Sequence, residues 1–92
     1  MLSYVMILAV DIGNTDTVLG VKKEDWYTHR ITSQADDSVV FYESQINNYL
    51  LPIGLEKVKH IVVSSVVPKL TPTFLEALKN VTKKSANLIG PT

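Results

Sequence analysis

The chain opens with a run of apolar residues, 6–10, which ends in a carboxylate, Asp11, and a polar turn. A short apolar run with turn residues behind it is typical of a strand that is buried on both faces. Gly13 and Asn14 are the residue types that best tolerate positive φ, so we expect the chain to double back there as a hairpin. Residues 18–21 are mostly apolar again and are expected to form the returning strand.

The next part of the pattern predicts a third strand and then a helix. Residues 26–31 are expected to form a third strand in an antiparallel meander, with residues 26, 28 and 30 on one side and residues 27, 29 and 31 on the other. Ser33 is expected to cap the helix, with Asp36 as its partner in a capping box. Apolar residues then recur at helical spacing between residues 39 and 50, and Pro52 is expected to end the helix.

A second apolar run, residues 60–67, predicts another buried strand. It is expected to be parallel to the first strand because a helix separates it from the meander. A second helix is expected with Thr71 as its cap and Pro72 at its first position, and residues 87–89 are expected to form a short last strand. The predicted order is β-β-β-α-β-α-β, an α/β fold with a mixed five-stranded sheet and helices packed on it.

Composition narrows the class of protein. The chain has 92 residues, which allows one domain, and its nine basic and nine acidic residues give a formal net charge of zero. A surface for nucleic acid or an anionic membrane would need a basic excess, so neither partner is expected. There is no cysteine, which fits a cytoplasmic protein without disulfides or thiolate metal sites. Residues 1–5 lack the basic region of a signal peptide and are interpreted as an optional leader.

The predicted hairpin carries the candidate chemistry. A tight glycine turn can expose consecutive backbone N–H groups that hold phosphate oxygens, and Thr15 and Thr17 would add hydroxyl donors. Asp11, at the rim of a buried strand, could hold Mg²⁺ directly or through water. The same residues also suit an ordinary hairpin in which Asp11 caps its own turn, and the pattern alone leaves both interpretations open.

Other polar residues have structural explanations beside their chemical ones. Ser64 and Ser65 lie where a parallel strand would end, which is a common place for ligands, but they could equally satisfy backbone groups there. His29 and His60 are expected to be structural or surface residues. The acidic pair at residues 36–37 could be a catalytic dyad, but its position at a helix start explains the charge more simply.

The predicted order of elements resembles the ribonuclease H-like half-domain of the sugar-kinase, Hsp70 and actin clan of ATPases, whose first hairpin holds phosphate and metal. Within that clan the hairpin resembles the first phosphate motif of type III pantothenate kinases, in the residues Asp11-Ile12-Gly13-Asn14-Thr15. Residues 64–72 resemble the Ser-Ser-Val-Val-Pro…Thr-Pro segment of the same family, and Trp26 followed by residues 30–32 fits its third strand. The resemblance covers the chain from Met6 onward, so residues 6–92 are expected to form the N-terminal domain.

This resemblance implies a function. The complete enzyme would transfer the γ-phosphoryl group of ATP to pantothenate, the first step toward coenzyme A, with Mg²⁺ and a monovalent cation, K⁺ or NH₄⁺. Such enzymes are typically homodimers. The resemblance implies that Asp11 holds the metal and that the phosphate-binding residues are Asp11, Ile12, Gly13, Asn14, Thr15, Asp16, Thr17 and Val18.

The catalytic aspartate of the family belongs to a Gly-x-Asp-Arg segment that is expected beyond Thr92. No catalytic residue is therefore assigned, the domain is expected to stop before the catalytic segment and the second domain, and the chain alone is expected to be inactive. Asp16 also departs from the family, which commonly has asparagine there, and would place an extra negative charge beside the phosphates. Two alternatives stay open: a non-catalytic accessory, regulatory or remnant member of the family, and another kinase of the clan.

Overall fold

A single mixed sheet of five strands is the frame of the molecule. The computed structural model describes residues 6–22, 24–32 and 38–90, and its strand order is β3-β2-β1-β4-β5. The first three strands pair antiparallel as a meander, and β4 and β5 run parallel to β1. This confirms the predicted sheet. The strands are β1 (Met6–Ile12), β2 (Asp16–Lys22), β3 (Trp26–Thr32), β4 (Val58–Ser65) and β5 (Asn87–Ile89).

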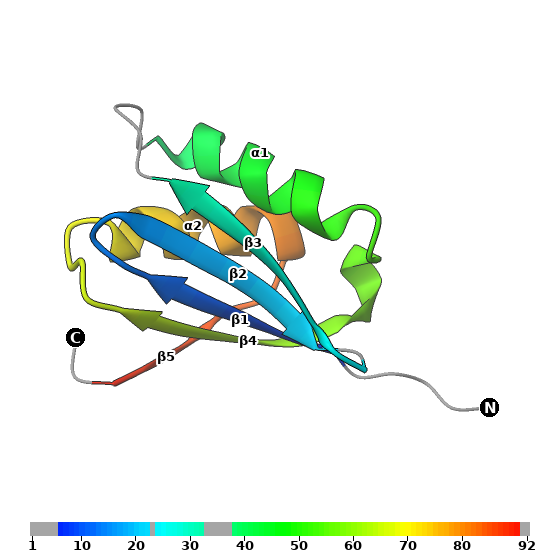
Figure 1. Cartoon of the computed structure of the whole chain (residues 1–92). Coiled ribbons are helices and arrows are strands. Elements are labelled where there is room, and N and C mark those ends of the chain that lie inside the picture. The colour runs from blue at the N-terminus through cyan, green and yellow to red at the C-terminus, as the bar shows by residue number, and fades with distance from the viewer. Residues whose placement is uncertain (1–5, 23, 33–37, 91–92) are drawn as a thin grey trace.

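Both α-helices cover the same face of the sheet. Helices α1 (Val39–Leu50) and α2 (Thr71–Thr82) lie next to each other on one side, and a short 3₁₀ helix, η1 (Leu55–Lys57), leads into β4 (Figure 1). Neither α-helix in the described part of the chain has the length and apolar character needed to cross a bilayer. The other side of the sheet, which we call the open face, carries no helix formed by the residues that the structure describes.

This arrangement corrects the expectation that the first strand is buried on both faces. Leu8, Val10 and Ile12 are fully buried under the helices, whereas Ile7 is 46% exposed and Asp11 is exposed. The alternation arises because successive side chains of a strand point to opposite faces and only one face is covered. An uninterrupted apolar run therefore did not indicate that only one face of this strand is covered.

The core lies between the helices and the covered face of the sheet. Each α-helix presents a buried stripe to it, with Tyr42, Ile46 and Leu50 on α1 and Phe74, Ala77 and Leu78 on α2. The Tyr42 and Phe74 rings meet with centroids 4.9 Å apart, which joins the two helices directly. Burial of these large side chains supplies most of the driving force that holds the layers together.

A tyrosine from α1 connects this helix to the meander. The Tyr49 hydroxyl accepts a hydrogen bond from the Val21 amide (3.1 Å) and donates one to the Tyr27 carbonyl. Val21 and Tyr27 are partners in the β2–β3 register, so the hydroxyl bridges the two strands at one point of their pairing. Burial raises the pKa of Tyr49, and the hydrogen bond from the Val21 amide partly opposes that shift.

Helix α1 begins later than the sequence predicted. Its N-cap is Ser38, whose Oγ accepts a hydrogen bond from the Phe41 amide (3.1 Å). A serine oxygen there satisfies one of the amides that a helix start leaves without an intrahelical partner. The predicted capping box, Ser33 with Asp36, and the acidic pair at residues 36–37 lie outside the described residues.

The junction between β4 and α2 also differs from the prediction. β4 ends at Ser65, because the Ser65 hydroxyl accepts a hydrogen bond from the Val67 amide (3.0 Å) and turns the chain out of the sheet. Leu70, not Thr71, is the N-cap of α2. The Thr71 hydroxyl is used elsewhere, because it donates to Ser65 Oγ (2.8 Å) and to the Val67 carbonyl (3.0 Å). Pro72 is consequently the second residue of the helix.

Candidate functional site

The β1–β2 hairpin closes over a two-residue loop. Asp11 pairs with Val18, and the Gly13 amide donates to the Asp16 carbonyl (2.9 Å), which leaves Asn14 and Thr15 exposed at the tip. The expectation of positive φ at Gly13 and Asn14 was wrong, since the described residues with positive φ are Gly54, Lys83 and Gly90. Gly13 is needed for space instead, because a Cβ there would lie 2.9 Å from the Asp16 carbonyl oxygen.

This closure limits which groups of the hairpin can meet an anion. The Gly13 amide is already used within the turn, so the exposed tip, Asn14 and Thr15, is the part of the loop that can face a ligand. The Thr15 hydroxyl lies on an exposed residue, whereas Thr17, which carries the other predicted hydroxyl donor, is buried. Phosphate contacts by this turn stay a prediction, and the exposed tip is the part of the turn that is accessible for them.

The remaining predicted residues divide between the two faces of the sheet. Ile12 is fully buried and Thr17 is 3% exposed, so their side chains belong to the covered face. Asp11 and Val18, which pair with each other, line a cavity on the open face. Because the Thr17 hydroxyl is buried, any contribution of this residue to a ligand site comes from its backbone.

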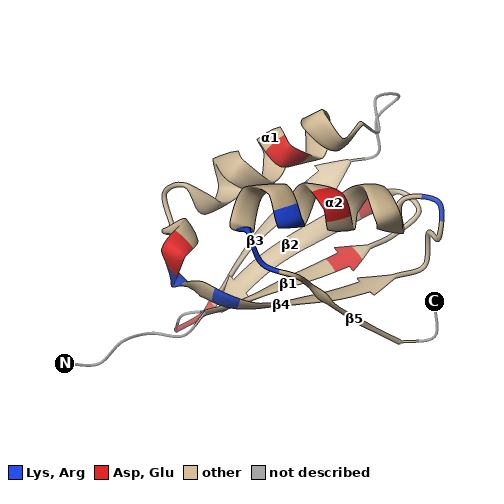
Figure 2. Cartoon of the chain, turned by 180° about the vertical axis from the view of Figure 1, so that it is seen from behind, with Lys and Arg blue, Asp and Glu red and all other residues tan. Residues whose placement is uncertain are grey.

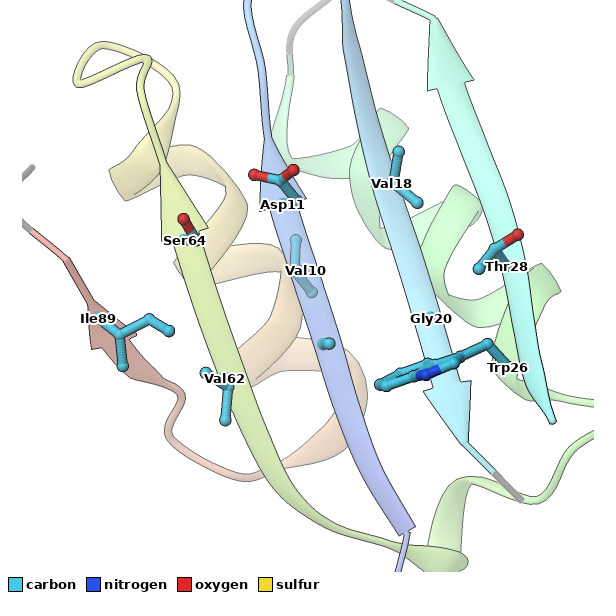
Figure 3. Close-up of a pocket in the computed structure, with 10 residues that line it drawn as sticks. Val10, Asp11, Val18, Gly20, Trp26, Thr28, Val62, Ser64 and Ile89 are labelled. Carbon is cyan, nitrogen blue, oxygen red and sulfur yellow. The ribbon is translucent and has the colours of Figure 1, made fainter. Parts of the chain in front are cut away.

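The cavity on the open face has a volume of about 240 Å³ and is lined almost entirely by apolar atoms. The Trp26 indole lies across β2 above Gly20 and forms one wall (Figure 3). A side chain at Gly20 would meet this ring, since a Cβ there would lie 3.2 Å from Trp26 Cε3. Gly20 thus lets the indole lie close to the sheet, a role that the strand pattern alone did not indicate.

Asp11 and Ser64 are the polar residues at the strand-end side of this cavity. They are partners in the parallel β1–β4 register, and Figure 3 shows their side chains next to each other on neighbouring strands. Ser65 points the other way and is 3% exposed, with its hydroxyl bonded to Thr71 and the Val67 amide. The two serines therefore differ in their surroundings: Ser64 lines the cavity, and Ser65 satisfies backbone and hydroxyl groups at the strand end.

An ion pair at the edge of the hairpin involves a residue that sequence reasoning had not singled out as a site residue. Arg30 Nη1 lies 2.7 Å from Asp16 Oδ2 and bridges β3 to the first residue of β2. The extra negative charge expected from Asp16 is thus balanced by a neighbouring guanidinium. The meander register places Arg30 opposite Val18, two residues from Asp16, and this could have been worked out from the predicted strands.

The donor set of the hairpin suits Mg²⁺ held together with phosphate. Asp11 offers one exposed carboxylate, and the described residues contain no group of three or more His, Cys, Asp or Glu side chains that could cage a metal. Mg²⁺ usually keeps several waters and binds through one or two carboxylates plus phosphate oxygens, so a single carboxylate at the rim is sufficient. Acidic and basic positions are otherwise spread over strands, helices and connections (Figure 2).

The histidine predicted as a strand residue lies away from this site. His29 stacks on Tyr49 with ring centroids 5.9 Å apart, and its Nε2 is 3.4 Å from Gln45 Oε1. These contacts place it between β3 and α1, on the covered side of the sheet. It therefore contributes to packing of the helix on the meander.

The sequence matches one family model, described as type III pantothenate kinase, over residues 7–92. Similar curated proteins carry the same name: the one from Brevibacillus brevis is 31% identical and the one from Bifidobacterium animalis subsp. lactis is 34% identical, each over 90 residues. These alignments cover 94% of this chain but 35% and 36% of the relatives, so the chain spans about a third of the length of the relatives it matches.

Solved structures support the fold independently. The PPX-GPPA enzyme of Aquifex aeolicus superimposes with a TM-score of 0.54 over 92% of this chain and 36% of its own, at 14% sequence identity. A likeness at this level of identity concerns the fold alone. It agrees with the ribonuclease H-like arrangement of sheet and helices described above.

Proposed function

The chain belongs to the type III pantothenate kinase family, and from this we propose that its β1–β2 hairpin holds the phosphates of ATP for transfer to pantothenate. The family membership does not favour the alternative of another kinase of the clan. Phosphoryl transfer depends mainly on positioning the reactants and offsetting phosphate charge, and the hairpin offers groups for both tasks.

The observation that carries this proposal is the position of Asp11. Asp11 is the second-last residue of the central strand, is exposed, and lies on the open face beside Ser64. Asp11 would hold Mg²⁺, which when bound would offset the negative charge of the phosphates. Asn14 and Thr15, at the exposed tip, would donate hydrogen bonds to phosphate oxygens.

We further propose that turnover needs groups that these 92 residues do not supply. Among the described residues that line the cavity, Asp11 is the single carboxylate, and its proposed task is to hold the metal. A second group would be needed to accept the proton of the pantothenate hydroxyl, because an attacking hydroxyl must lose its proton during transfer. We also propose that the full-length protein uses a monovalent cation, forms a homodimer and is located in the cytoplasm.

A ligand-stabilisation experiment tests the proposed phosphate site. The unfolding midpoint of the chain is measured as Mg-ATP is added, for the wild type and for Asp11→Asn. A ligand at ten times its dissociation constant stabilises a protein by about 1.4 kcal/mol, and the gain keeps growing with the logarithm of ligand concentration. We therefore expect the midpoint of the wild type to rise steadily as Mg-ATP is added and that of the variant to stay unchanged. Asp25→Asn is the matched control, because Asp25 is exposed in the connection at the far end of the hairpin.

An equal rise in Asp11→Asn and the wild type would refute the assigned role of Asp11. The second part of the proposal is tested by measuring ADP formation with and without pantothenate. No pantothenate-dependent ADP is expected from the chain alone. Steady production of it would show that the chain contains a complete catalytic centre.

A further inference from the structure

The ion pair at the edge of the hairpin lies on the same face as the proposed site. Arg30 pairs with Val18 across β2–β3, and Val18 pairs with Asp11 across β1–β2. Directly opposite residues of paired strands project on the same face of a sheet, so Arg30 and Asp11 both project from the open face. Asp16 is two residues from Val18 on the same strand and shares that face, at the end nearest the loop.

The two partners of this pair differ in exposure. The Arg30 side chain is 64% exposed, whereas that of Asp16 is 25% exposed. A guanidinium has five N–H donors in a fork, and within the described residues the hydrogen bond recorded for this side chain is the one from Nη1 to Asp16. The Arg30 side chain is therefore accessible to an incoming phosphate.

The balance of charge at the loop suggests a role for the exposed Arg30 side chain. A polyphosphate at the loop would lie near two carboxylates, Asp11 and Asp16, and the repulsion from Asp16 needs an opposing positive charge. Lys22 is at the opposite end of β2 and cannot provide it. Arginine matches phosphate geometry well because its planar fork can bind two oxygens at once.

On the basis of the proposed function, we infer that Arg30 is a phosphate-binding residue and that Asp16 competes with the phosphate for its guanidinium. An exposed ion pair is worth little, because water and salt screen it, so an incoming phosphate can replace the carboxylate. Asp16 thus lowers phosphate affinity in two ways: it adds a negative charge near the ligand, and it occupies the arginine.

The experiment is a set of binding titrations on the full chain with inorganic tripolyphosphate, with and without Mg²⁺. Removing Arg30 in Arg30→Gln is expected to weaken binding by roughly two- to fivefold, the scale of one solvent-exposed charged contact. Asp16→Asn is expected to strengthen binding by a similar factor. Arg30→Lys should bind with intermediate affinity, because it keeps the charge and loses the fork. Lys22→Gln makes the same charge change at the far end of the strand and is expected to bind like the wild type.

The double variant Asp16→Asn/Arg30→Gln tests whether Asp16 competes with phosphate for Arg30. If Asp16 acts only through its charge, its replacement strengthens binding equally whether or not Arg30 is present. If it occupies Arg30, the gain is smaller in the Arg30→Gln background. Equal gains in both backgrounds, or unchanged affinity in Arg30→Gln, would overturn the inference.

The inference and the proposed function can fail separately. Loss of Mg-ATP stabilisation in Asp11→Asn with unchanged tripolyphosphate affinity in Arg30→Gln would refute only the inference. Tripolyphosphate binding that depends on Arg30, without any Mg-ATP stabilisation, would refute only the proposed ATP site. An absence of tripolyphosphate binding in both the wild type and Asp16→Asn would overturn the inference. Urea unfolding of each variant serves as the control that its fold is intact.

Discussion

The two hydrogen bonds of the Tyr49 hydroxyl allow the stability loss on its removal to be predicted. Replacing Tyr49 with phenylalanine keeps the ring and removes the group that accepts from the Val21 amide and donates to the Tyr27 carbonyl. A partly buried backbone group without a partner costs about 1–3 kcal/mol, and direct pairing of the two strands can recover part of that loss. We therefore expect Tyr49→Phe to lower the free energy of unfolding by about 2 kcal/mol, or roughly 8–16 °C in Tm.

Urea unfolding at neutral pH measures this loss. Tyr27→Phe is the matched control, since the Tyr27 side chain is 55% exposed and only its backbone carbonyl takes part in the bridge. A surface change of this kind is expected to stay within about 0.5 kcal/mol of the wild type. A Tyr49→Phe variant as stable as the Tyr27→Phe control would show that the bridge contributes nothing to stability. Hydrogen exchange adds a local test, because the Val21 amide should exchange faster in Tyr49→Phe.

The same side chain makes stability depend on alkaline pH. Burial raises the pKa of Tyr49 in the folded chain above the ordinary value of 10.0. Between those two values the unfolded chain loses the proton and the folded chain keeps it, so this contribution to stability is complete below pH 10 and declines as pH rises through the folded pKa. The stability difference between the wild type and Tyr49→Phe should therefore narrow above pH 10. A constant difference at alkaline pH would contradict the assignment.

Three further substitutions test local features by urea unfolding. Gly13→Ala places a Cβ 2.9 Å from the Asp16 carbonyl oxygen and is expected to cost about 1–3 kcal/mol, whereas a wild-type midpoint would show that the turn can relax. Ser38→Ala removes the cap of α1 and is expected to cost about 1 kcal/mol, with Ser44→Ala, an exposed position within the same helix, as a control that loses none. Lys83→Gly relieves a left-handed residue (φ 63°) at the end of α2 and is expected to stabilise by roughly 0.5–1 kcal/mol, so a destabilised variant would contradict it.

The sequence predicted the sheet well because strands and helices have different hydrophobic periods. The meander, the parallel β4 and the short β5 all appeared in the pattern, since each is a local run bounded by turn residues. Helix ends were less predictable. Thr71 and Ser33 are good capping residues by type, but Thr71 bonds to Ser65 and Val67, which a local pattern cannot anticipate.

The site was predicted as one continuous stretch, residues 11–18, whose side chains lie on two opposite faces of the sheet in the structure. Asp11 and Val18 face the cavity, while Ile12 and the Thr17 side chain face the core, a distinction that depends on which face the helices cover. The Asp16–Arg30 pair joins residues 14 apart in sequence and becomes visible only once the strand register is known. Trp26 was placed correctly on its strand, but its position over Gly20 depends on packing.

The central position of β1 also affects the order in which the sheet can assemble. Its neighbour on one side, β2, follows at once, whereas its parallel neighbour, β4, begins only at Val58. During synthesis on the ribosome the meander can form early. The edge of β1 that later pairs with β4 stays unpaired until residues 58–65 have been synthesised. Unpaired edges invite association with other chains, so chaperone dependence of this protein should be greatest in that interval.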